Sequence, residues 1–324
     1  MALIQHKKLP ISTALCYKNK LLLSFQGEPQ LHLFQLSSQP YPHLSSFELK
    51  SHAICLDWGV KKDQILVGSE KGIYVLKINE NQITLINKTI IQAIKGVFSY
   101  LNESIMTGDT EGNIKVLNSE TFEELLSYKH QGTITDLDMS SEGELLASSS
   151  LDGTCRIYST KSMNKVKTLK FAEHNDSVNL PILGCKFSKS ADSLFTISSD
   201  KYSYITQWDV KELKPLATFR IHPAPVKFMI ISLDGFFMGI GTSDEWAKIL
   251  NLRTMDFERN MKDFESSTTA ISFTYDSRCV VAGSADGIKN VSNTRSEGFF
   301  SKASKIWVFL YFVCGFICVL DKKS

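Results

Sequence analysis

The sequence predicts an all-β protein: a seven-bladed β-propeller over residues 1–294, followed by one C-terminal transmembrane helix over residues 306–320. Three observations lead to this prediction. A unit of about 40 to 50 residues recurs along the chain. Each unit contains short stretches that alternate hydrophobic and polar residues between turn residues. One long hydrophobic run near the end carries no charged residue.

The unit is clearest in HQGTITDLDMSSEGELLASSSLDGTCRIY, residues His130–Tyr158. An alternating stretch is followed by a polar turn, a strand of small residues, a tight Asp152-Gly153 turn and a second alternating strand. This stretch resembles a WD repeat, which forms one four-stranded blade. Because one blade cannot bury both faces alone, such blades stack around an axis and cover one another.

The position of Gly153 recurs with a strand on each side. The equivalent positions are Pro29, Gly72, Gly112, Gly153, Ser203, Glu245 and Gly287. Seven units therefore fill residues 1–294. The last unit ends near Asn293, after its third strand, and we expect the strand-like piece Ala2–His6 to pair with it and close the ring. The insertion Phe171–Gly184 is expected on a surface loop.

Two polar residues of the central unit, His130 and Asp152, could form an acid/base pair. The resemblance to WD repeats instead implies a hydrogen bond inside the blade, completed by Ser148 and Tyr158, and this structural role is favoured. Trp208-Asp209 is expected to serve packing and turn formation in the same way. No phosphate-binding, metalloprotease or serine-hydrolase motif is present. The sequence therefore predicts no catalytic residue, no metal site and no small-molecule substrate.

The composition also limits the partners. The formal net charge is +2 and both signs are interspersed, so nucleic acid is not expected as a partner. The seven cysteines are scattered and lie in hydrophobic stretches, which favours reduced thiols packed in a core over a disulfide framework.

The hydrophobic run over residues 306–320 predicts the transmembrane helix. Ten of its fifteen residues are Ile, Leu, Phe or Val, which favours insertion by about 3 to 6 kcal/mol. As a helix it spans about 22 Å, which suits the thin membrane of the endoplasmic reticulum. Burial of the run in the propeller is the less favoured alternative. The side chains expected to anchor it are Ile306, Trp307, Phe309, Phe312, Phe316 and Leu320.

The charges that flank this run set the expected orientation. Arg295, Lys302 and Lys305 precede the run and slightly outweigh Lys322 and Lys323 after it, which places the propeller in the cytosol. We therefore expect a linker over residues 295–305, a single span and a lumenal tail over residues 321–324.

A cytosolic propeller followed by one such span resembles the endoplasmic-reticulum exchange factors for the small GTPase of the COPII coat, the family of the mammalian prolactin regulatory element-binding protein. The residues that carry this resemblance are the central unit, the insertion before LGCKFS, and SYITQWDVKELKPLATFRIHPAPVKFMIISLDGFFMGIGTSD. It implies an activity without covalent chemistry, in which the propeller distorts the GTPase and releases GDP so that coat assembly begins.

One departure concerns the first blade. The family has a long potassium-binding loop there that contacts the GTPase, whereas this chain has only the short connection Gln26–Pro29. The potassium site is therefore not matched and no cofactor is predicted. A shorter contact from Gln26, Gly27 and Glu28 is expected instead.

Three functions remain open after this reasoning. Exchange on the GTPase is favoured. A membrane-anchored scaffold that assists cargo exit without exchange is the second, with the plant relatives called phosphate transporter traffic facilitators as a precedent. A soluble adaptor with a buried hydrophobic end is the third.

Overall fold

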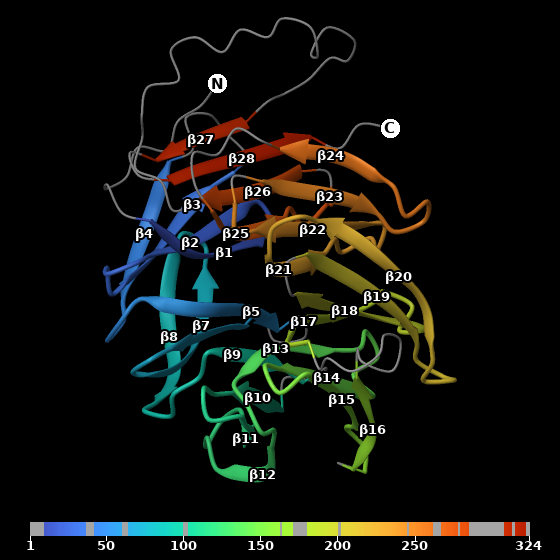
Figure 1. The fold of residues 1–324 in the computed structure, drawn as a ribbon. Helices are drawn as coiled ribbons and strands as arrows, with labels where there is room; N and C mark the ends of the chain where they lie inside the picture. The colour runs from blue at the N-terminus through green and yellow to red at the C-terminus, as the bar shows by residue number, and fades with distance from the viewer. Residues whose placement is uncertain are drawn as a thin grey trace, which may run out of the picture.

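The computed structural model describes most of the chain. The described residues are 10–36, 42–59, 64–99, 103–162, 164–170, 180–199, 202–244, 246–261, 267–277, 279–284, 308–312 and 315–321. All of their regular elements are strands, and the strands form four-stranded antiparallel sheets arranged around a common centre (Figure 1). The prediction of an all-β propeller is therefore confirmed.

Six sheets are each built from four consecutive strands. Blades 1 and 2 contain β1 (Ile11–Tyr17), β2 (Lys20–Phe25), β3 (Gln30–Gln35), β4 (His43–Glu48), β5 (Ala53–Gly59), β6 (Gln64–Ser69), β7 (Gly72–Asn79) and β8 (Gln82–Thr89). Blades 3 and 4 contain β9 (Lys95–Phe98), β10 (Ser104–Gly108), β11 (Asn113–Asn118), β12 (Glu124–Lys129), β13 (Ile134–Met139), β14 (Leu145–Ser150), β15 (Thr154–Ser159) and β16 (Lys165–Lys170). Blades 5 and 6 contain β17 (Ile182–Phe187), β18 (Ser193–Ser199), β19 (Ser203–Asp209), β20 (Pro215–His222), β21 (Val226–Ile231), β22 (Phe237–Thr242), β23 (Ala247–Asn251) and β24 (Phe257–Met261).

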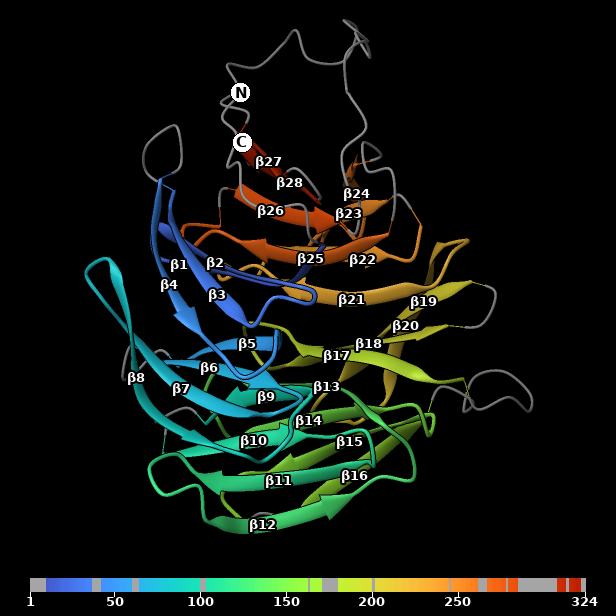
Figure 2. The same ribbon diagram turned by 90° about the vertical axis from the view of Figure 1, so that its left-hand side faces the viewer.

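The first strand of each blade lines the centre of the ring. β1 contacts β5, β5 contacts β9, and the contacts continue through β13, β17 and β21 to β25 (Thr268–Phe273), which returns to β1. The second strands are buried on both faces, as in β2, β10 and β14. The fourth strands face solvent, as β12 does with five of its six residues exposed or nearly so. Figure 2 shows the blades stacked in this way from the side.

A register shift recurs where the first strand of a blade pairs with the second. It falls between Ile11 and Thr13 in blade 1, and at the equivalent place in five other sheets, including Ile134/Asp136 in blade 4. A bulge of this kind adds local twist to a strand. Its repetition shows that the predicted units are structurally equivalent.

The turn positions predicted from the repeat precede or begin the third strands β3, β7, β11, β15, β19 and β23. Gly153 has a φ of 80° and Gly112 a φ of 85°, a conformation that glycine adopts without the strain of a side chain. The sixth position, Glu245, and the seventh, Gly287, lie outside the described residues. So do Ala2–His6, expected to close the ring, and residues 171–179 of the insertion.

The remaining sheet is assembled from two distant segments. Its order is β25, β26 (Cys279–Ser284), β28 (Gly315–Asp321), β27 (Val308–Phe312). The described residues of the segment predicted as a transmembrane helix therefore form two paired strands here, drawn in red beside β26 (Figure 1). The described part of the chain contains no helix suited to crossing a membrane.

A physical reason for this difference lies in the composition of the run. Valine, isoleucine, phenylalanine, tyrosine and tryptophan favour strands, and they make up most of residues 306–320. The outer edge of β26 also offers unpaired backbone groups to a strand. Of the expected anchor residues, Phe309 and Phe312 lie in β27, Phe316 and Leu320 lie in β28, and Ile306 and Trp307 lie outside the described residues.

Candidate partner-binding site

The expected GTPase contact lies in the tight turn between β2 and β3 of blade 1. Gln26 and Gly27 are exposed, and the Gln26 amide donates a hydrogen bond to the carbonyl oxygen of Pro10 at 2.7 Å. Gly27 has a φ of 77°. Glu28 differs from its neighbours because it is buried, with Oε2 at 3.6 Å from Nε2 of His32. Only two of the three predicted contact residues therefore face solvent.

Glu28 belongs to a polar group inside blade 1 that the sequence reasoning missed. Nδ1 of His32 lies 3.3 Å from Nε2 of His43 and 3.0 Å from Oγ of Ser46, so these groups share hydrogen bonds across β3 and β4. Register explains the arrangement, since His32 lies directly opposite Ser46. The group fixes the strands that follow the exposed turn, and burial lowers the pKa of His43.

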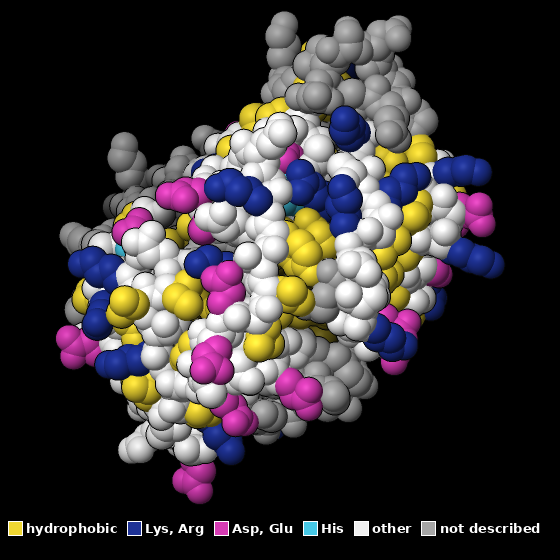
Figure 3. Space-filling view, turned by 90° about the horizontal axis from the view of Figure 1, so that it is seen from below, with side chains coloured by type: hydrophobic (Ala, Val, Ile, Leu, Met, Phe, Trp, Pro, Cys, Tyr) yellow, Lys and Arg dark blue, Asp and Glu magenta, His cyan; other side chains and the backbone are white. Residues whose placement is uncertain are grey.

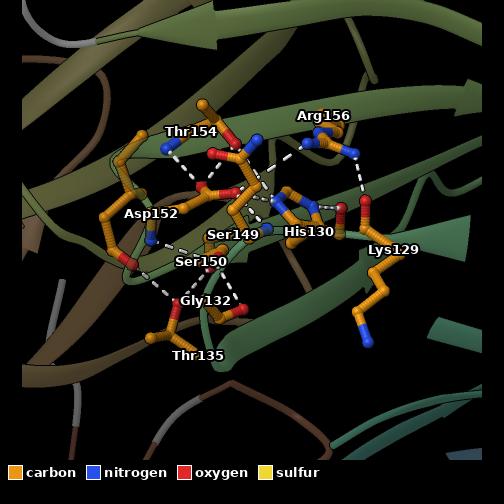
Figure 4. A network of polar contacts seen from close by, with 12 residues as sticks. Lys129, His130, Gly132, Thr135, Ser149, Ser150, Asp152, Thr154 and Arg156 are labelled. Carbon is orange, nitrogen blue, oxygen red and sulfur yellow. Dashed lines mark hydrogen bonds and ion pairs between the residues drawn. The ribbon is translucent and has the colours of Figure 1, made fainter. Parts of the chain in front are cut away.

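In blade 4 the structure brings His130 and Asp152 together (Figure 4), and Ser148 completes the group. His130 Nδ1 lies 3.0 Å from Oδ2 of Asp152, and His130 Nε2 lies 2.8 Å from Oγ of Ser148. Asp152 also accepts hydrogen bonds from the Gln131 amide at 2.9 Å and from the Thr154 hydroxyl at 2.6 Å. The network ties the start of blade 4 to the turn between its second and third strands.

Electrostatics explain how this network is held. Burial lowers the pKa of His130, helped by Arg156 and opposed by Asp152, so the imidazole is neutral near pH 7. A neutral imidazole donates through one nitrogen and accepts through the other. Burial raises the pKa of Asp152, but hydrogen bonds from Thr154 and Gln131 outweigh it and the net shift is downward. The His130 side chain is 0% exposed, which supports a structural role over acid/base chemistry.

The remaining predicted blade residues make contacts of their own. Burial raises the pKa of Tyr158, while hydrogen bonds with Arg156 and Ser148 oppose the shift, and its ring lies 4.4 Å from that of Tyr128. In blade 5 the aromatic-to-hydroxyl contact is made by Trp208, whose Nε1 donates to Oγ1 of Thr196 at 2.8 Å. Asp209 closes the following turn by accepting a hydrogen bond from the Glu212 amide.

The centre of the ring contains a second feature missed from the sequence, a repeated bond between neighbouring blades. A side chain near the end of one inner strand accepts a hydrogen bond from a backbone amide of the next inner strand. The three pairs are Asp57 with Phe98 at 2.8 Å, Asp138 with Phe187 at 2.8 Å, and Ser272 with Cys16 at 2.9 Å. The last of these pairs joins β25 to β1 and so closes the ring.

An ion cluster lies beside the middle pair. Lys186 Nζ lies 2.9 Å from Oδ2 of Asp136 and 3.3 Å from Oδ1 of Asp138, and it donates to the carbonyl oxygen of Leu137 at 3.2 Å. Lys95 Nζ lies 3.7 Å from the other carboxylate oxygen of Asp136. The cluster therefore links the inner strands β9, β13 and β17 of three successive blades.

Burial shifts the pKa values of this cluster. Burial lowers the pKa of Lys186, but Asp136 and Asp138 outweigh it and raise the pKa above its usual value. Burial raises the pKa of Asp138 to about 6, although Lys186 and the Phe187 amide act in the opposite direction. Burial also raises the pKa of Asp57. The cluster is a structural link because its charges satisfy one another.

The sequence contained a signal for the repeated bonds between inner strands. Asp57, Asp138 and Ser272 occupy equivalent places in their units, so aligning the units would have placed them on adjacent inner strands.

Elsewhere the described surface is mixed: Figure 3 shows both signs of charge and hydrophobic side chains interspersed over the face seen from below. The cysteines with described side chains, Cys16, Cys55, Cys155 and Cys185, are buried. Among the described residues no three His, Cys, Asp or Glu side chains gather in a way suited to a metal ion.

Comparison with known proteins identifies one unit directly. The family described as "WD domain, G-beta repeat" matches residues 122–159, which cover β12 of blade 3 and most of blade 4. The repeat type predicted from the sequence is therefore present in the part of the chain that carries the His130 network.

Relatives of known name match longer parts of the chain. SEC12-like protein 1 of Arabidopsis thaliana is 24% identical over 195 residues, which cover 59% of this chain and 47% of that protein. Guanine nucleotide-exchange factor SEC12 of Mus musculus is 27% identical over 161 residues, 45% of this chain and 38% of that protein. Eukaryotic translation initiation factor 3 subunit I of Culex quinquefasciatus is 34% identical over 97 residues, 30% of this chain and 28% of that protein. The chain matches less than half the length of each, and it is similar to SEC12-like WD proteins.

Proposed function

We propose that this protein is a guanine-nucleotide exchange factor for the small GTPase that initiates COPII coat assembly at the endoplasmic reticulum. The observation that carries the proposal is the similarity to SEC12 and SEC12-like proteins over 45% to 59% of the chain, on a propeller fold. The name of the mouse relative states the exchange activity.

Exchange of this kind requires binding energy and no covalent step. A protein that binds the nucleotide-free GTPase more tightly than the GDP-bound form must, by linkage, weaken the binding of GDP. A rigid propeller suits this task, because buried second strands and bonds between inner strands hold its surface loops in place. The proposal therefore needs a contact surface and no cofactor.

The proposed contact includes Gln26 and Gly27 in the turn of blade 1. Their exposure supports this placement, whereas Glu28 is left out because it is buried against His32. The segment 306–320 is proposed to hold the protein at the membrane of the endoplasmic reticulum, with the propeller in the cytosol. Attachment to one membrane raises the local concentration of exchange factor where the GTPase acts.

The direct test is release of fluorescent GDP from the purified coat GTPase. We expect the full chain to accelerate release at micromolar concentration, and Gln26→Arg to reduce the acceleration about tenfold by placing a long cation in the contact. Gln82→Arg, at an exposed position on β8, is the matched control and should leave the rate unchanged. The proposal fails when the unmodified chain leaves GDP release at its intrinsic rate.

A second candidate is a membrane-anchored scaffold that binds partners without exchange. The short turn favours it, because only four residues, 26–29, join β2 to β3, and one of them is a glycine. A scaffold predicts stable capture of the GTPase or of cargo with no change in GDP release. The same assay therefore separates the two candidates.

A further inference from the structure

We infer that β27 (Val308–Phe312) and β28 (Gly315–Asp321) have two mutually exclusive placements: the outer strands of the seventh sheet away from a membrane, and part of a helix in the bilayer at the membrane. This inference rests on the membrane attachment proposed above. The segment would then change between two placements and not serve as a permanent anchor, because the same residues cannot occupy both places. Four features of the chain support it.

The first feature is the pairing of the hairpin with the propeller. β28 pairs antiparallel with β26, with Cys279 opposite Asp321, Val280 opposite Leu320, and Ala282 opposite Cys318. β27 adds to the outer side of β28 from Val308 opposite Val319 to Phe312 opposite Gly315. The backbone of the hairpin therefore depends on β26 for one row of its hydrogen bonds.

The second feature is the composition of the hairpin. Residues 306–320 contain no charged residue, which is the property of a membrane span. A two-stranded hairpin cannot remain as it is in hydrocarbon, since its outer edges would leave backbone groups without partners. Entry into a bilayer thus requires the segment to leave β26 and become helical.

The third feature is that the ring is closed without the hairpin. Ser272 on β25 accepts the hydrogen bond from the Cys16 amide on β1 at 2.9 Å. Val281 packs in one hydrophobic cluster with Ile11, and a Cβ placed on Gly283 would lie 2.9 Å from Ile11 Cδ1. On the other face Val280 and Ala282 pack with Ile249 of blade 6. β25 and β26 are therefore held by both neighbouring blades.

The fourth feature is the length of chain between β26 and β27. Residues 285–307 separate them, and 23 residues reach up to about 80 Å when extended. This length allows the segment to leave the sheet and reach a membrane without moving the propeller. Departure would uncover the edge of β26, whose unpaired backbone groups are a template for another strand.

A disulfide that joins β26 to β28 tests the inference in the full chain. Ala282→Cys is combined with Cys279→Ser and Cys314→Ser, so that the new thiol lies opposite the native Cys318 in β28. Directly opposite residues of antiparallel strands are close enough for a disulfide. We expect the bond to form in the absence of lipid, and the oxidised chain to float with phosphatidylcholine–phosphatidylinositol vesicles at least tenfold less than the reduced chain.

The same protein with Cys318→Ser should float equally under oxidising and reducing conditions. Vesicles added before the oxidant should prevent the disulfide. The inference is overturned when no disulfide forms away from lipid, when vesicle-bound chain forms it equally well, or when the reduced chain does not float.

A second measurement avoids any change at the buried Ala282. Successive amides of β26 point alternately to β25 and to β28, so only those of Val280–Ala282 that face β28 lose their partner when it leaves. Hydrogen exchange of these amides in the unmodified chain should be at least tenfold faster with vesicles than without, and equal rates would contradict the inference. GDP release measured on the same samples tests the proposed exchange activity separately from the switch. Loss of exchange activity with intact switching defeats only the proposed function, and the reverse result defeats only the switch.

Discussion

Blade 4 and the seventh sheet contain the same number of strands but are held together in different ways. The four strands of blade 4 follow one another from Ile134 to Lys170, and His130, in the loop that precedes its first strand, bonds to Ser148 on its second strand and to Asp152 in the next turn. The seventh sheet joins β25 and β26 to a hairpin that lies 23 residues further on. Only its inner half is tied to neighbouring blades through described side chains.

This difference indicates that blade 4 contributes more to the stability of the ring than the seventh sheet does. Consecutive strands form with short loops and therefore low entropic cost, whereas a distant segment closes a long loop before it gains contacts. Charged and polar groups concentrate between blades 3, 4 and 5, where Lys186 links two inner strands. We therefore expect substitutions there to cost far more stability than substitutions that touch β25 or β26.

The largest loss is expected for Lys186→Met. Removing the ammonium leaves Asp138 without its cation and Asp136 with Lys95 alone at 3.7 Å, which costs about 3 to 5 kcal/mol of unfolding free energy. Urea unfolding measures this loss of unfolding free energy. Lys161→Met breaks an exposed pair with Glu144 and is the control, with no shift expected in the midpoint. Equal effects of the two substitutions would show that the ion cluster around Lys186 does not stabilise the ring.

Asp138 should make stability depend on pH. Its pKa is raised to about 6 from 3.8, so its contribution is fully present below pH 3.8 and is lost as the pH rises through about 6. The unfolding free energy of the wild type should therefore fall relative to Asp138→Asn between pH 4 and 7, by up to about 3 kcal/mol. Parallel curves for the two proteins would contradict this assignment.

A somewhat smaller loss is expected for Asp152→Ala in blade 4. The change removes the acceptor of His130, of the Gln131 amide and of Thr154, which costs about 2 to 3 kcal/mol. Chemical denaturation measures the loss, and Glu142→Ala in the exposed turn of the same blade is the control. A cost no greater than that of the control would mean that the network is dispensable.

The smallest loss is expected at the seventh sheet. Ser272→Ala removes the bond to the Cys16 amide and should cost about 1 to 2 kcal/mol, because hydrophobic contacts around Ile11 and Val281 remain. Ser267→Ala, which removes an exposed contact with Lys227, is the control. A loss as large as that of Asp152→Ala would reverse the comparison between the two regions.

The sequence predicted the propeller because period, alternation and turn residues repeat locally, as at Gly112 and Gly153. It also predicted which residues surround His130, since the repeat pattern places them. It missed the Lys186 cluster and the His32 group, which depend on register between strands. It assigned a helix to residues 306–320 because composition alone does not state whether an open strand edge such as that of β26 is available.

The central claim, exchange on a small GTPase, is tested most directly by comparing affinities for two forms of that GTPase. Surface plasmon resonance of the full chain should show binding to the nucleotide-free coat GTPase at least 100-fold tighter than to the GDP-bound form, a difference of about 2.7 kcal/mol. Equal affinities for the two forms would contradict the account and identify a scaffold.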